Sequence, residues 1–220
     1  MSELFSYPEF DPQGIKLLTK AGDGENDMLM DIAVYEMKAG EERSFSSGSD
    51  EMAVLLLTGE ISFSWEEKKE WGKRSSLMEE GPYCLHVSKG VLVSIGAKED
   101  SQILVQRTEN DKAFNSVFYR PQDCTNDIFG EGLLENKMKR TVRTIFDYNN
   151  APYSNMVNGE VITHQAGGPA TLLMTIPSLR FITTALNGLR ALAPASLGKM
   201  SLRSRMEAVL PLPAAGLILR

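Results

Sequence analysis

Metal-binding or nucleophilic chemistry needs histidine, cysteine or carboxylate side chains at spacings that can bring them together. The chain has two histidines, His86 and His164, and two cysteines, Cys84 and Cys124. A transition-metal site needs three or four N, O or S donors converging on one point, and no HxH, HxxxH or CxxC spacing occurs. The sequence therefore predicts no metal ligand, no bound cofactor and no identifiable catalytic residue in this chain, and a structural role for both cysteines in a reduced compartment.

The two histidines stand in different contexts. His86 lies in CLHVS between apolar neighbours, which favours a structural strand residue over a ligand. His164 has no partner histidine, so no functional role is expected for it.

Two groups of acidic residues have structural explanations. The segment EEKKEW, residues 66–71, is most simply a solvated hairpin tip. Asp127, Glu131 and Glu135 lie in TNDIFGEGLLEN, and a loop between domains explains these carboxylates at least as well as catalysis does.

The elements that would position these residues are short strands. Segments rich in β-branched and aromatic residues recur at roughly ten-residue spacing between turn-forming clusters, which predicts an all-β sandwich or barrel. These segments are MLMDIAVYEM, MAVLLLTG, EISFSW, YCLHVS, VLVSIGA and QILVQR. Two hairpins are predicted, one turning at Thr58 and Gly59 and one at Lys89 and Gly90. This succession of short strands and turns is typical of a jelly roll.

The stretch from MKAGEERSFSSGSDEMAVLLLTGEISFSW to GPYCLHVSKGVLVSIG resembles the cupin barrel. Metal-binding cupins carry HxH and a Glu where this chain has ERSFSS, residues 42–47. The resemblance thus implies a first cupin without metal ligands.

A second stretch is similar to a specific family. GEGLLENKMKRTVRTIFDYNNAPYSNMVNGEVIT, residues 130–163, resembles the start of the second cupin in 5-deoxy-glucuronate isomerases, bicupin enzymes of myo-inositol catabolism related to the 4-deoxy-5-ketouronate isomerases. The matching features are Gly130, Gly132, Asn136, the RxVRxI pattern of Arg140, Val142, Arg143 and Ile145, and the strand GEVIT. The resemblance implies aldose–ketose isomerisation of 5-deoxy-glucuronate to 2-deoxy-5-keto-gluconate, a sugar-acid substrate, a divalent metal in the intact enzyme, and compatibility with a homo-oligomer.

The composition changes abruptly at His164. Residues 165–220 contain one acid, Glu207, one aromatic, Phe181, and six basic residues, for a net charge of +5, whereas residues 1–164 have a net charge of −11. In the resembled family GEVIT precedes the metal-binding histidines and glutamate. The loss of one base at codon 164 explains why this chain differs from the family after GEVIT. Residues 171–176, read in the other frame, permit YPPHDH, which has the paired histidines of the family. The aspartate there is forced by Met174 and Thr175.

The expected organisation is therefore an N-terminal cupin without metal ligands over residues 1–112. Residues 113–164 are the connection and the first strands of an incomplete second cupin, and residues 165–220 are an out-of-frame tail, poorly ordered or locally helical. An amphipathic helix is compatible with residues 174–193, with Leu179, Ile182, Leu186 and Leu189 on one side, but no function is assigned to it.

Other classes of function are disfavoured. The N-terminus resembles no signal peptide, and AVLPLPAAGLIL is too short and too rich in proline to span a bilayer, so a cytoplasmic protein without membrane association is expected. The basic residues of the tail are scattered without interleaved aromatics, which disfavours nucleic acid. The alternatives to an inactive isomerase chain are a non-catalytic binding or dimerisation module and an aggregation-prone fragment.

Overall fold

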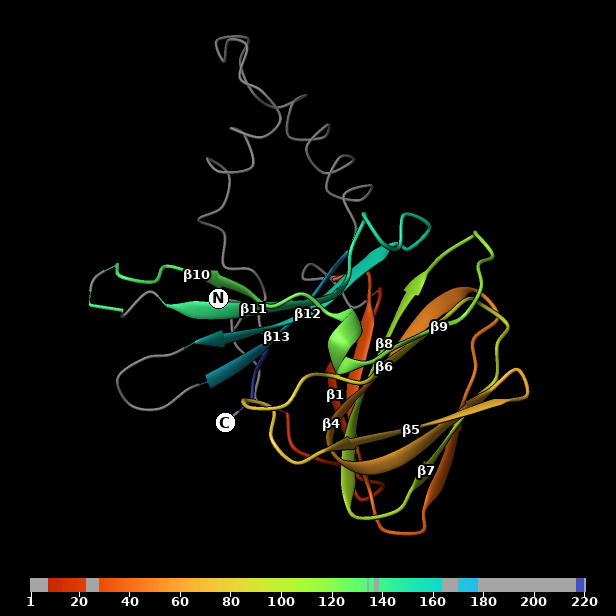
Figure 1. Ribbon diagram of the computed structural model, residues 1–220. Helices are drawn as coiled ribbons and strands as arrows, with labels where there is room; N and C mark the ends of the chain where they lie inside the picture. The colour runs from red at the N-terminus through yellow and green to blue at the C-terminus, as the bar shows by residue number, and fades with distance from the viewer. Residues whose placement is uncertain are drawn as a thin grey trace, which may run out of the picture.

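The computed structural model describes residues 8–22, 28–133, 135–136 and 139–163 with their side chains, and residues 170–177 and 217–219 as strands only. The described part of the chain is almost entirely β-structure, as the sequence predicts. Figure 1 shows a barrel with a second sheet beside it, whose β10–β11 end points away from the barrel. Within the described ranges there is no helix long and apolar enough to cross a membrane.

Nine strands form the barrel, and β4 takes part in both of its sheets. One sheet has the order β1-β2-β8-β4-β6-β9, and the other consists of β3, β7, β4 and β5. The strands are β1 (Ile15–Thr19), β2 (Asp31–Met37), β3 (Glu42–Phe45), β4 (Asp50–Trp65), β5 (Lys68–Arg74), β6 (Cys84–Val87), β7 (Val93–Ala97), β8 (Ser101–Glu109) and β9 (Val117–Tyr119). All neighbours pair antiparallel, which is the pairing of a jelly roll.

Alternating residues of these strands fill the barrel, because successive side chains of a strand point to opposite faces. The interior cluster contains fifteen buried side chains, among them Met52, Val54, Phe63, Ile95 and Val105. It is apolar throughout. The first barrel is therefore closed by hydrophobic packing.

The predicted hairpin at Thr58 and Gly59 is wrong. β4 runs without a turn from Asp50 to Trp65, and its register against β8 shifts between Leu56 and Thr58. At this irregularity β4 leaves one sheet and enters the other. Gly59 has φ of +104°, and a Cβ there would lie 2.1 Å from Ser101 Oγ, so the position needs glycine. A glycine between two strand-like runs signals a bulge as well as a turn.

The second predicted hairpin is also wrong. The chain does turn at Lys89 and Gly90, but β6 and β7 are not hydrogen-bonded to each other. β6 pairs with β4 and β9, whereas β7 pairs with β3 and β4. The turn therefore carries the chain from one sheet to the other.

The hairpin tip predicted in EEKKEW is confirmed. Trp65 pairs with Lys68 at the end of the β4–β5 hairpin, so Glu66 and Glu67 form a two-residue turn. Both have positive φ, 45° and 60°, as a tight hairpin turn of this hand requires.

The second sheet has the order β10-β11-β12-β13-β14. Its strands are β10 (Asp127–Phe129), β11 (Arg140–Phe146), β12 (Met156–Thr163), β13 (Ala170–Pro177) and β14 (Leu217–Leu219). β11 and β12 confirm the strands expected from RxVRxI and GEVIT. A short 3-10 turn, η2 (Pro121–Asp123), precedes this sheet.

Strand β13 corrects part of the expected helix. Residues 174–177 belong to β13, which pairs with β12 from Met156 to Thr163. The free edge of β12 offers main-chain hydrogen bonds that local helical periodicity does not reveal. Leu179, Ile182, Leu186 and Leu189 lie outside the described residues, as does His164.

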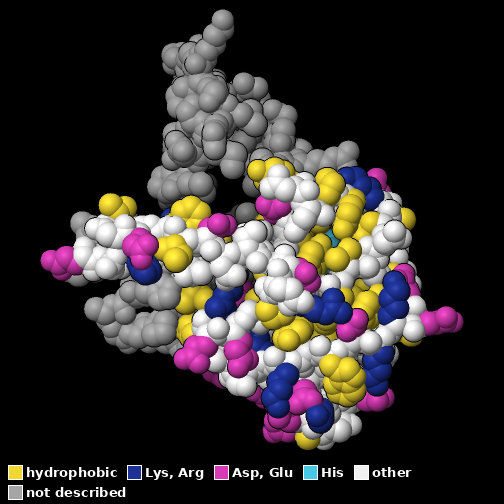
Figure 2. Space-filling model, in the orientation of Figure 1, with side chains coloured by type: hydrophobic (Ala, Val, Ile, Leu, Met, Phe, Trp, Pro, Cys, Tyr) yellow, Lys and Arg dark blue, Asp and Glu magenta, His cyan; other side chains and the backbone are white. Residues whose placement is uncertain are grey.

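The second sheet packs on the outer face of the barrel. A second apolar cluster joins Leu55, Cys84 and Leu104 of the barrel to Phe146 and Met156 of the sheet. β9 lies after residue 112 in the sequence yet pairs with β6 of the barrel. On the face shown in Figure 2, acidic and basic side chains lie interspersed over the barrel.

Candidate functional site

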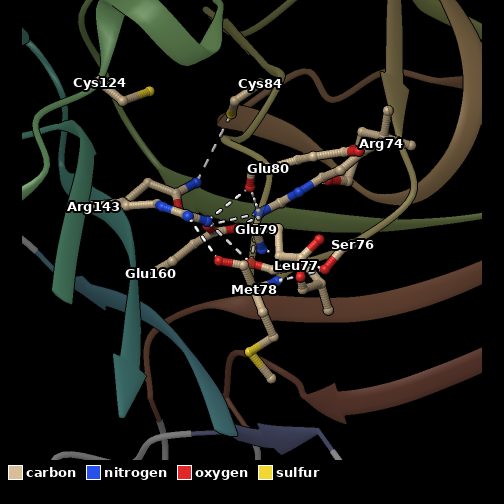
Figure 3. A network of polar contacts seen from close by, with 12 residues as sticks. Arg74, Ser76, Leu77, Met78, Glu79, Glu80, Cys84, Cys124, Arg143 and Glu160 are labelled. Atoms are coloured by element: carbon tan, nitrogen blue, oxygen red, sulfur yellow. Dashed lines mark hydrogen bonds and ion pairs between the residues drawn. The ribbon is translucent and has the colours of Figure 1, made fainter. Parts of the chain in front are cut away.

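The most concentrated group of polar side chains lies between the barrel and the second sheet. Arg74 ends β5, Arg143 lies on β11 and Glu160 lies opposite it on β12. Arg74 Nη1 and Nη2 donate to the two carboxylate oxygens of Glu160 at 2.6 and 2.8 Å, and the side chains of this pair are 0% exposed. Arg143 Nη1 lies 3.5 Å from Glu160 Oε2. We call these three residues the Arg–Glu–Arg cluster (Figure 3).

Both arginines also hold the loop that connects β5 to β6. Arg74 Nη2 donates to the carbonyls of Leu77 and Glu80 at 3.3 and 2.9 Å. Arg143 donates to the same two carbonyls at 3.0 and 2.7 Å and, through Nη2, to that of Met78 at 2.9 Å. Figure 3 shows this loop lying against both guanidinium groups. The loop is therefore fixed by two cations from different sheets.

The charges of the cluster do not cancel. Two guanidinium groups share one carboxylate, and the second positive charge is compensated by carbonyl dipoles and by Asn126 Oδ1, which accepts from Arg143 Nε at 3.2 Å. In a buried setting the desolvation of ions is offset only when such partners are complete. The donors are occupied by the protein itself apart from Arg74 Nε, which is buried without a partner. The cluster thus joins two layers of the fold through buried ion pairs and hydrogen bonds.

His86 belongs to a second polar bridge between the same layers. Its Nε2 lies 3.1 Å from Glu51 Oε2, and both side chains are 0% exposed. Glu51 Oε1 accepts hydrogen bonds from the Asn155 main-chain N–H at 2.6 Å and from Ser154 Oγ at 3.2 Å. The His86 ring stacks on Phe146 with centroids 4.2 Å apart and an interplanar angle of 3°.

The two ring nitrogens of His86 have different surroundings. Its Nδ1 is buried and has no hydrogen-bond partner, whereas Nε2 contacts the Glu51 carboxylate. The histidine is a buried structural residue of β6, as the sequence predicts.

The thiols of the two cysteines are poor nucleophiles. Cys84 is fully buried, and this burial raises the pKa of its thiol well above the ordinary value. Burial, with the nearby Glu160 carboxylate, raises the pKa of the Cys124 thiol to about 12. Both thiols are free and protonated at neutral pH.

The carboxylates of the connection also have structural surroundings. Glu131 forms an ion pair with Lys139 at 2.6 Å, and Thr125 Oγ1 donates to Asp127 at 3.1 Å. Asp127 lies on the short strand β10, which the sequence did not predict. Glu135 adopts a positive φ of 55° next to Asn136, and the Gly132 N–H donates to Asn136 Oδ1.

The described residues do not offer a metal site. Among the residues whose side chains the structure describes, no three His, Cys, Asp or Glu residues come close enough to hold a metal ion. The residues that the structure does bring together, Arg74, Arg143 and Glu160, were not singled out as a group from the sequence. For Arg143 and Glu160 the available signal was a charged residue among the apolar residues of a strand, whereas Arg74 ends the charged strand KKEWGKR and gave no such signal.

The comparisons with known proteins agree with the all-β fold. The family model KduI/IolB matches residues 8–169. No curated protein sequence matches the chain.

Two solved structures share the fold over a large part of the chain. An IolB-like protein from Salmonella typhimurium LT2 has 18% identity and a TM-score of 0.55, and the similarity covers 61% of this chain and 50% of that protein. A putative glyoxylate-induced protein from Pseudomonas aeruginosa has 9% identity and a TM-score of 0.52, with 69% and 56% of the two chains covered. The chain thus spans about half the length of these relatives, and such identities establish the fold alone.

Proposed function

Because the chain belongs to the KduI/IolB family, a family of cupin-type sugar isomerases, we propose that it derives from a 5-deoxy-glucuronate isomerase and is itself inactive. The observation that carries the proposal is the family match over residues 8–169, which includes the whole first barrel and ends five residues after His164. The change of composition at His164 falls at the same place.

The first barrel supports the proposal that this chain is inactive. Its interior is occupied by an apolar cluster, and the described residues do not fit a divalent metal, because their only histidine, His86, is buried against Glu51. Under the proposal, the donors of the family's metal site belong to the segment after His164 in the original reading frame. The base lost at codon 164 removes them.

The experiment compares two full chains, the present one and one with a single base restored at codon 164. Each is incubated with 5-deoxy-glucuronate and added Mn²⁺ or Zn²⁺, and turnover is followed by NMR while bound metal is measured by elemental analysis. We expect neither turnover nor stoichiometric metal for the present chain and both for the restored one.

Removal of metal from the restored chain provides the control. The restored chain treated with a chelator should lose its turnover and regain it when metal is added back. Equal turnover in the untreated restored and present chains would place the catalytic residues within residues 1–164 and overturn the proposal.

One observation favours the alternative of a non-catalytic module. Among the described residues, the barrel and strands β11 and β12 bury two apolar clusters. Sedimentation analysis of the present chain distinguishes a defined monomer or dimer, expected for a module, from the heterogeneous large species expected for an aggregation-prone fragment.

A further inference from the structure

A small hollow of about 200 Å³ opens beside the edge strand β1 of the first barrel. Four of its lining side chains, Leu17, Ala33, Tyr35 and Val105, are largely apolar. The other three are Lys20, Asp31 and Arg107. We call it the β1 hollow. It is distinct from the Arg–Glu–Arg cluster, which lies on the outer face of the barrel.

The strand register places the hollow on the inner face of the barrel sheet. Ala33 pairs with Val105, and Asp31 pairs with Arg107 two positions further along. Val105 belongs to the interior cluster, so Arg107, two residues later on β8, points to the same side. Arg107 and Asp31 thus lie on the inner face of the sheet, beside the apolar side chains of Ala33 and Val105.

Arg107 lacks the carboxylate partner that other arginines of the barrel have. No ion pair joins its guanidinium group to a carboxylate among the described residues, and Nε is buried without a hydrogen-bond partner. Its guanidinium group lies over the Phe45 ring, whose centroid is 6.0 Å from Cζ. By contrast, Arg43 is paired with Glu41 and Arg120 with Glu70.

Asp31 does not supply the missing partner although it lies opposite Arg107. Its Oδ1 accepts a hydrogen bond from the Ala21 N–H at 2.7 Å, and no ion pair joins it to Arg107. The hollow therefore carries two positive charges and one negative charge. A guanidinium that lies over an aromatic ring and has no carboxylate partner among the described residues suits a planar carboxylate.

We propose that the β1 hollow binds a short-chain carboxylate, with the carboxylate on Arg107 and the hydrocarbon part against Leu17, Ala33 and Val105. Lys20 adds a second positive charge at the rim. The volume admits a ligand of only a few carbon atoms, and the apolar walls favour an aliphatic body over a polyhydroxylated one. The site is independent of the isomerase proposal, because it lies in the first barrel and needs no metal.

The test titrates the full chain with butyrate in metal-free buffer and follows main-chain amide shifts by NMR. Saturable shifts are expected in β1, β2 and β8. Butan-1-ol supplies the same hydrocarbon chain without the charge and should not saturate the site. Butanol binding as tight as that of butyrate would show a merely apolar hollow and overturn the proposal.

Three variants locate the site. Arg107→Met keeps an unbranched side chain over Phe45 and should weaken butyrate binding by roughly tenfold or more, since hydrogen bonds to a charged group are lost. Arg120→Met is the matched control, because Arg120 also lies over a ring, that of Phe118, but has its own carboxylate partner. It should leave binding unchanged.

The third variant keeps the proposal testable if Arg107→Met fails to fold. Asp31→Asn preserves an oxygen for the Ala21 N–H and removes the one negative charge of the hollow. Butyrate should therefore bind a few-fold more tightly to it. Unchanged or weaker binding to Asp31→Asn, or unchanged binding to a folded Arg107→Met, would overturn the assignment.

Discussion

At the scale of single residues, Glu160 decides how the two layers of the protein meet. It is the only carboxylate within ion-pairing distance of Arg74 and Arg143 among the described residues, and it is fully buried. Removing one partner of a buried ion pair costs more than the pair contributes when complete, because the remaining charge stays desolvated. The effect of a substitution should therefore be large and specific to this site.

Glu160→Gln should lower the free energy of unfolding by about 3–5 kcal/mol, the range found when buried ion pairs lose one member. Urea denaturation followed by circular dichroism measures it. Glu60→Gln is the control, because Glu60 pairs with the exposed Lys73 and Lys98 and exposed pairs contribute little. Similar losses in the two variants would show that burial of the cluster is not what stabilises the interface.

The cysteines give a second prediction at this scale. Burial raises the pKa of both thiols, so the native protein should react slowly with Ellman's reagent at pH 8 and quickly once unfolded. Cys124→Ser assigns any residual native reaction, because Cys124 is the more exposed of the two. Fast native reaction that persists in Cys124→Ser would contradict the burial of Cys84.

These thiols also set a direction for stability against pH. Their folded pKa values lie above the ordinary value of 9.0, so above about pH 9 the unfolded chain releases protons that the folded chain retains. The stability conferred by the protonated thiols is complete below pH 9 and decreases as pH rises toward 12.

At the scale of elements, β9 completes the barrel, and β11 and β12 cover its outer face, although all three strands follow residue 112. β9 pairs with β6, and β11 and β12 cover the outer apolar face formed by β4, β6 and β8. A barrel without them keeps its interior cluster but exposes one hydrophobic face.

A chain ending at residue 112 should give a strand-dominated circular dichroism spectrum and bind the dye ANS strongly. A chain ending at residue 163 should bind little dye and melt at a higher temperature, because the second apolar cluster is then covered. A mainly helical spectrum of the shorter chain would contradict the barrel. Equal dye binding and melting temperatures would contradict the packing of β11 and β12.

At the scale of the whole molecule, buried contacts join the barrel to the second sheet. Four kinds of contact cross the interface: the second apolar cluster, the Arg–Glu–Arg cluster, the hydrogen bonds from Ser154 and Asn155 to Glu51, and the hydrogen bond from Asn158 to Gln106 at 2.6 Å. Contacts of this number and burial make it costly for one layer to unfold alone.

The chain ending at residue 163 should therefore unfold in a single transition, with fluorescence of Trp65 and Trp71 in the barrel and circular dichroism giving the same midpoint. His86→Ala removes one bridge and its stacking on Phe146, and should lower both midpoints together. Separate midpoints for the two probes would show that the layers fold independently.

The sequence by itself determined the β-rich class, several strands and the buried state of His86, because alternation of apolar and polar residues reports which face a side chain takes. It also determined the family, through the features between Gly130 and Thr163, which the match over residues 8–169 includes. The fold class, the strand positions and the family features all depend on residues that are close together in the sequence.

Only the tertiary structure decided which strands pair and which charges meet. Gly59 signalled a turn, but the pairing of β4 with both sheets makes it a bulge. Arg74 and Glu160 are 86 positions apart, and nothing local couples them. The lack of a partner for Arg107 became visible only when Asp31, opposite it on β2, proved to be held by Ala21. Strand periodicity fixes the side that a residue faces, whereas its partner depends on how distant segments pack.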